Sequence, residues 1–177
     1  MEITDFLTSV KAFTEKATAD LRLPVRIQKK GDETTYRPPT VYRMRIPDSG
    51  ASDKLAPYIL HQIVTTDDLC QIGERAECSV LLRSVFCIYY PMAEDNPAED
   101  EGQLLLLEVM QRFRIALLRA QILNERYRLD IRNEPLEGLY YPDKMSPYYV
   151  GEFASNWQIP AVEWNDLNKW KQGGYPM

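Results

Sequence analysis

Residues 79–90 constrain the fold more than any other segment, because apolar side chains occupy both alternating faces of a predicted strand. One face carries Val80, Leu82, Phe86 and Ile88, and the other carries Leu81, Val85, Cys87 and Tyr89. A strand that is apolar on both faces is typical of the middle of a sheet that is covered on both sides. Pro91 ends the run, because proline cannot donate to a strand ladder.

A long helix is predicted after an acidic loop, from about residue 96 to residue 124. Asn96, Pro97 and Glu99 suit the cap, first and third positions of a helix start. The helix has two apolar stripes: Leu106, Val109, Met110, Phe113, Leu117 and Ala120, and then Leu104, Leu107, Ile115, Leu118 and Ile122. In a chain this small, the second stripe must meet another long element or a second subunit. This pattern predicts an oligomer.

The remaining periodic segments predict an α+β domain. Residues 2–20 form an amphipathic helix pattern, and shorter strand patterns occur at residues 24–30, 39–46, 58–65, 127–132 and 149–162. We therefore expect a mixed, mainly antiparallel sheet flanked by two main helices. The 177-residue chain is interpreted as one domain over residues 1–164 with a flexible tail at residues 165–177.

Charge and cysteine usage exclude several classes of protein. The formal net charge of −5 argues against broad binding of the phosphate backbone. Three cysteines without close pairing make a zinc site improbable and suggest reduced thiols in the cytosol. The acidic residues 94–101 lack the ligand order of a calcium loop and are best explained as solvated residues at a helix start. No apolar segment approaches about 20 residues, so no membrane contact is expected.

Catalytic motifs are lacking from the sequence. His61 is the only histidine, no Gly-x-Ser-x-Gly elbow accompanies it, and no glycine-rich phosphate loop is present. The sequence leaves open a catalytic pair of carboxylates, because any two of the 26 acidic residues can come together in a fold. The expectation is a non-enzymatic protein with no catalytic residue, metal or cofactor.

The C-terminal third is rich in tyrosine and proline. Tyr140, Tyr141, Tyr148 and Tyr149 fall within ten residues, and Trp157 follows. Such side chains bury a large area at low rotamer cost and are enriched at interfaces. The alternative is that these rings only cover a sheet edge within one subunit. The expected subunit or partner contacts are Leu104, Leu107, Ile115, Leu118, Tyr140, Tyr141, Tyr148, Tyr149 and Trp157.

Residues 146–153 (Ser-Pro-Tyr-Tyr-Val-Gly-Glu-Phe) and 156–160 (Asn-Trp-Gln-Ile-Pro) resemble the C-terminal strand region of tail-terminator and neck-type proteins of long-tailed bacteriophages. The order of helices and strands is similar too. Residues 47–78 match no pattern of that family and are interpreted as a variable insertion.

The resemblance implies a structural virion protein of the tail or neck, assembled in the host cytoplasm. It implies a ring of six subunits that caps the tail tube and contacts the major tail protein and a head-completion or connector protein. DNA would pass through the lumen without specific binding. The alternatives are another tail or neck structural subunit, or a small hydrolase or regulatory binding protein.

Overall fold

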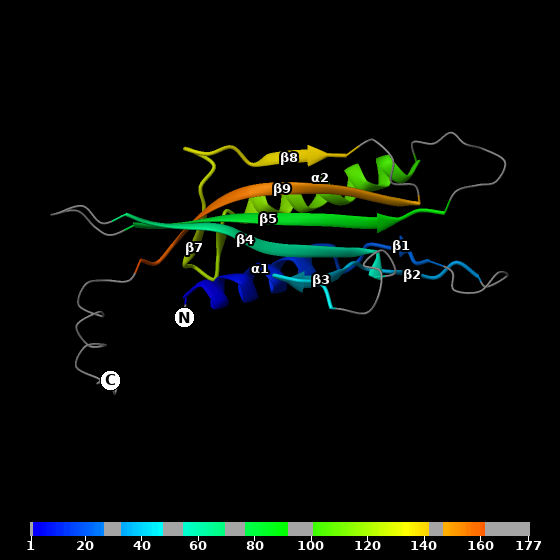
Figure 1. Ribbon diagram of the computed structural model, residues 1–177, viewed down its shortest axis with the longest axis horizontal. Coiled ribbons are helices and arrows are strands. Elements are labelled where there is room, and N and C mark those ends of the chain that lie inside the picture. The colour runs from blue at the N-terminus through cyan, green and yellow to red at the C-terminus, as the bar shows by residue number, and fades with distance from the viewer. Residues whose placement is uncertain are drawn as a thin grey trace, which may run out of the picture.

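The fold has two layers, with one sheet covered by two helices on the same face (Figure 1). The computed structural model describes residues 2–26, 33–47, 55–69, 77–91, 101–141 and 147–161. The helices are α1 (Glu2–Thr18) and α2 (Glu101–Ala120). With a mixed, mostly antiparallel sheet beside them, the predicted α+β class is confirmed.

The main sheet has the strand order β3-β4-β5-β9-β7-β6, and β8 also pairs with β9. The strands are β3 (Thr40–Arg43), β4 (Tyr58–Leu69), β5 (Glu77–Tyr89), β6 (Ile122–Leu123), β7 (Tyr127–Leu129), β8 (Glu137–Tyr140) and β9 (Tyr148–Ile159). Only β3 and β4 run parallel; the other pairs are antiparallel. A separate pair joins β1 (Leu23–Pro24) and β2 (Tyr36–Arg37).

Strand β9 lies in the middle of this sheet. One side of it pairs with β5 along the whole strand, from Tyr148 to Ile159. The other side is shared, because β8 pairs with residues 151–154 and β7 pairs with residues 157 and 158. Segments that are distant in sequence therefore meet on one strand.

The core lies between the sheet and both helices. Phe86, Phe113 and Phe153 form its centre, with ring centroids 5.2–6.2 Å apart. The opposite face of the sheet carries only a smaller cluster of Ala56, Tyr58, Leu60 and Cys87. We expected β5 to be covered on both of its faces. In the structure, both helices cover the same face of β5, and the other face has only this smaller cluster.

Part of residues 47–78, interpreted from the sequence as a variable insertion, lies in the central sheet. Strand β4 pairs with β5 over almost its whole length, so residues 58–69 and 77–78 belong to the central sheet. Polar residues such as Gln62, Thr66 and Asp67 interrupt the apolar alternation of β4 in the sequence. Residues 48–54, 70–76 and the tail at 165–177 lie outside the described residues.

Several boundaries differ from the predicted ones. The strand expected at residues 127–132 ends at Leu129, because the Asp130 carboxylate accepts hydrogen bonds from the backbone N–H groups of Arg132 and Asn133 and forms a turn. The helix start expected at Asn96 and residues 27–30 of the first predicted strand lie outside the described residues.

Candidate interaction surface

Helix α2 buries one of its two apolar stripes and exposes the other. Leu106, Val109, Met110, Phe113 and Leu117 face the core. On the second stripe, Leu104 is 59% exposed, Leu107 40% and Ile115 38%, and Leu118 is half-buried. Within the described residues, no element of the chain covers this second stripe, so it is available to another protein.

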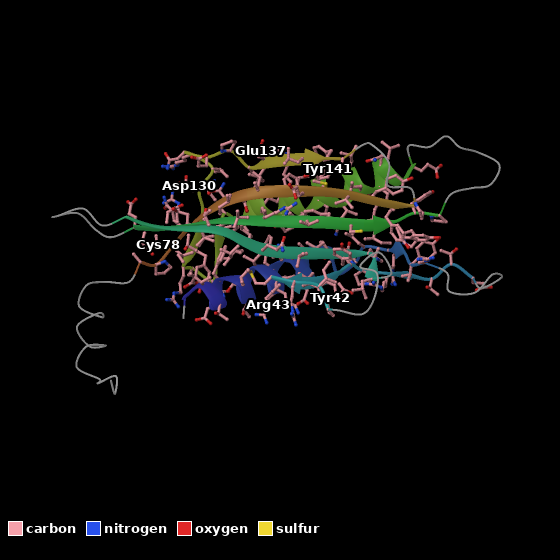
Figure 2. The ribbon with its side chains drawn as sticks, viewed as in Figure 1. Tyr42, Arg43, Cys78, Asp130, Glu137 and Tyr141 are labelled. Atoms are coloured by element: carbon pink, nitrogen blue, oxygen red, sulfur yellow. The ribbon has the colours of Figure 1, made fainter. Side chains whose placement is uncertain are left out.

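Two exposed tyrosines, Tyr140 at the end of β8 and Tyr141 just after it, lie on opposite faces of the sheet. Glu137 and Tyr141 are labelled along this edge in Figure 2. The Tyr141 hydroxyl donates to Glu152 Oε1 at 2.9 Å on the face that the helices leave open. Tyr140 is on the other face, where its hydroxyl oxygen is 3.2 Å from the position of a Cβ on Gly138. Tyrosine rings therefore flank both sides of this edge.

An ionic network holds Tyr141 in place. Arg83 of β5 donates to the carboxylate of Glu152 on β9, and that carboxylate also accepts the Tyr141 hydroxyl. Glu152 is buried, whereas Arg83 remains exposed. The hydrogen bond to Glu152 raises the pKa of Tyr141, because an ionised phenol would lose that bond. Tyr141 therefore remains a neutral donor.

Tyr148 belongs to the open face of the sheet. Its ring lies 5.5 Å from that of Tyr89, and its hydroxyl accepts a hydrogen bond from Arg26 Nη1 at 3.0 Å. Because it is half-buried, part of the ring remains available for contact.

Tyr149 and Trp157 are corrections to the expected interface. Trp157 is 1% exposed, packs on Phe6 at 5.4 Å between ring centroids, and donates its indole N–H to Ser155. Tyr149 is 8% exposed and lies so close to Gly102 that a Cβ there would be 2.2 Å from the ring. Both face α1 and α2, so neither contributes to the outer surface.

His61 is a buried structural residue and is the centre of a hydrogen-bonded chain. The Thr14 hydroxyl donates to the Val10 carbonyl at 2.8 Å, so it accepts from His61 Nε2 at 2.9 Å. Nδ1 is then the acceptor for the Ser84 hydroxyl at 2.9 Å. Burial lowers the pKa of His61 to about 3. Ser84 and His61 have the composition of a nucleophile and its base, but both are sealed from solvent.

The end of the sheet near β7 has a polar pocket of about 490 Å³. Its lining includes Arg128, Asp130, Arg132 and Gln158, so charges of both signs are mixed. Hydrogen bonds from Asn133 and the adjacent backbone lower the pKa of Asp130. This carboxylate is therefore already committed to the turn that ends β7.

The described residues contain no cluster of histidine, cysteine and acidic side chains that would hold a metal ion. Burial raises the pKa of Cys78 to about 12, which makes its thiol unreactive. In the same part of the chain, no helix is long and apolar enough to cross a bilayer.

Comparison with known proteins gives no relative from which a role can be transferred. No protein-family model matches the chain, and no curated protein has a matching sequence. The candidate function is therefore argued from the surface itself.

Proposed function

We propose that this chain is a structural subunit of a phage tail, a tail terminator that assembles head-to-tail into a ring of six and caps the tail tube. The resemblance of residues 146–160 motivates the proposal. The observation that carries it is the difference between the two edges of the sheet. A closed ring needs one surface that fits a second, different surface.

The first edge is β3, which pairs only with β4 within the described residues. The backbone N–H groups of Thr40 and Met44 point inward, to the carbonyls of Pro57 and His61. Because N–H direction alternates along a strand, those of Val41 and Arg43 point outward. Met44 follows with 47% of its side chain exposed. This edge therefore offers outward backbone groups beside an apolar side chain.

The second edge is β8, at the opposite side of the sheet (Figure 2). Here the Tyr141 N–H points inward to the Val150 carbonyl at 3.4 Å, so the backbone groups of Gly138 and Tyr140 point outward. Tyr140 and Tyr141 are 45% and 39% exposed. A strand that paired with β8 would have the Tyr140 ring near one of its faces and the Tyr141 ring near the other.

The two edges have directions that suit each other. Strands β3, β4 and β9 run one way and β5 and β8 run the other. In a ring with its axis along the strands, β8 of one copy would meet β3 of the next in antiparallel orientation. Antiparallel ladders are slightly more stable per residue than parallel ones. Edge pairing also covers backbone groups that otherwise invite aggregation.

In this function the ring contacts the major tail protein on one side and a head-completion or connector protein on the other. DNA passes through the lumen without specific binding, which suits a net charge of −5. The chain performs no chemistry in this function and works by shape and by the contacts of its edges.

Native mass spectrometry at increasing protein concentration, with and without tail tubes, tests the ring. The expected result is a hexamer. The variant Tyr140→Glu should break the β8 edge and Met44→Glu the β3 edge, leaving each protein unable to form the ring. Tyr36→Glu is the matched control, because Tyr36 is 56% exposed on β2, outside the main sheet.

Mixing the two edge variants identifies the type of contact. Each variant keeps one intact edge, so a head-to-tail contact predicts an edge-paired mixed dimer that cannot extend through its remaining edges. A wild-type protein that remains monomeric even with tail tubes would contradict the proposal. If both edge variants still formed hexamers, the ring would be supported, but β3 and β8 would not be its contact surfaces.

A further inference from the structure

The exposed stripe of α2 has a spacing that is symmetric about its middle residue. Leu107 and Ile115 each lie four residues from Gln111, and Leu104 and Leu118 each lie seven residues from it. At 3.6 residues per turn these five positions share one side of the helix, with Gln111 at the centre. Gln111 is exposed. The stripe therefore has the same pattern in both directions.

We propose that two copies of this chain pair through α2, antiparallel, about a two-fold axis at Gln111. In this pairing Leu104 of one copy faces the partner's Leu118, and Leu107 faces the partner's Ile115. Every apolar side chain of the stripe meets an apolar one. A two-fold contact is self-complementary by definition, which is the property that this spacing supplies.

Gln111 sets the register of the pair. Its side-chain amide has both a donor and an acceptor, so two copies on the axis can hydrogen-bond to each other. A shift by one turn would place Gln111 against the partner's Leu107 or the partner's Ile115 and leave the amide without a partner at the contact. One central polar residue fixes the register of coiled coils in the same way, at some cost in affinity.

Charge favours the antiparallel direction. Antiparallel helices place the positive end of each helix dipole beside the negative end of the other. The pairing also sets the acidic first turn of α2, with Glu101, beside the basic last turn of the other helix, with the partner's Arg119. A parallel pair would bring like ends together.

The size of the stripe predicts a weak pair. Four partly exposed apolar side chains on a helix of 20 residues, about 30 Å long, fall below the roughly 800 Å² per partner of a standard interface. We expect a dissociation constant on the order of 10 μM or weaker. The contact leaves both edges of the sheet free, so it uses a different surface from the proposed ring.

Disulfide trapping tests the geometry directly, in a background where Ser replaces Cys70. Cys78 and Cys87 are buried and remain. Gln111→Cys should form a disulfide-linked dimer with itself, because residues on the axis come close enough to bridge. Leu104→Cys and Leu118→Cys should each remain unlinked alone and form a mixed dimer when combined. Glu108→Cys is the matched control, since its two copies would lie about 9 Å apart along the helix.

Sedimentation of the double variant Leu107→Glu/Ile115→Glu gives the second measurement, with the expected loss of the concentration-dependent dimer. A Gln111→Cys protein that links no faster than the Glu108→Cys control would overturn the pairing. Linking of Leu104→Cys with itself would also overturn it, in favour of a parallel contact. Hexamers that form without these disulfides would support the proposed ring and contradict the α2 pair. Disulfide-linked dimers in a protein that forms no hexamer would support the α2 pair and contradict the ring.

Discussion

At the scale of single residues, the buried polar groups have the clearest effect on stability. His61 has no exposed surface, and both nitrogens of its neutral ring are hydrogen-bonded to hydroxyl groups. A second proton would place a positive charge in the buried core, away from water. The folded state therefore resists protonation of His61, whereas the unfolded chain protonates it near pH 6.5.

Stability should fall as the pH falls below about 6.5, since only the unfolded chain takes up a proton until the folded pKa of about 3 is reached. The expected loss from His61 is about 2 kcal/mol between pH 7 and pH 5. Urea denaturation at both pH values measures it. The variant His61→Gln removes the only histidine, so it should reduce the difference in unfolding free energy between pH 7 and pH 5 by about the same amount. An equal pH dependence in the variant and the unchanged protein would show that His61 is not its cause.

At the scale of elements, β5 and β9 are joined by more than their backbone ladder. Arg83 and Glu152 are diagonal neighbours, two residues from direct opposition, since Arg83 pairs with Ala154 and Glu152 with Val85. Their ion pair crosses between these two neighbouring strands and extends to Tyr141, just beyond β8. A buried carboxylate thus links three strands on the open face.

The variant Arg83→Met should cost about 1–2 kcal/mol of unfolding free energy, because the mostly buried Glu152 carboxylate loses its charged partner. The double variant Arg83→Met/Glu152→Leu should recover part of this loss, since no unpaired charge remains. Chemical denaturation of the two single variants and the double variant measures the coupling. Additive effects would show that the pair contributes nothing, and Arg128→Met serves as an exposed control.

Long periodic elements were predictable from the sequence, and short ones were not. Both helices and strands β5 and β9 follow their own periodicity, so residues 79–90 and 149–162 differ little from the observed spans. Strand β8 was missed, because four residues including Gly138 carry no clear alternation and depend on pairing with β9.

The candidate surface was predicted in part. The exposed stripe of α2 followed from helical spacing, because two stripes on one helix cannot both face one core. Tyr149 and Trp157 were misassigned because aromatic clustering does not say which face a ring occupies. The signal was available: both share the alternation of Phe153, whereas Tyr148 has the opposite one. The hydrogen bonds of His61 with Thr14 and Ser84 join residues that are distant in sequence, so no local sequence pattern predicts them.

At the scale of the whole molecule, the helices occupy one face and leave the sheet edges and the other face for contact. The whole chain has a formal net charge of −5. Because nonspecific DNA binding depends on neutralising phosphates with basic side chains, the assembled protein should repel duplex DNA.

We expect no retardation of linear duplex DNA in a gel mobility assay at about 150 mM salt. Replacing the exposed Glu77, Glu134 and Glu137 by lysine raises the formal charge by six, from −5 to +1, and should introduce measurable binding at low salt. Retardation of DNA by the unchanged protein would remove the support for a lumen that DNA traverses freely.

The position of β9 has a consequence for how the chain acquires its structure during synthesis. It is the last of the described elements to leave the ribosome, and β5, β7 and β8 all pair with it. Until it arrives, β5 lacks a neighbour on one side, β8 has no strand to join, and β7 pairs only with β6. A nascent chain stalled before Tyr148 would expose the apolar face that Phe86 and Phe113 line. Quality control by proteases should therefore recognise incomplete chains efficiently, and only finished subunits should reach assembly.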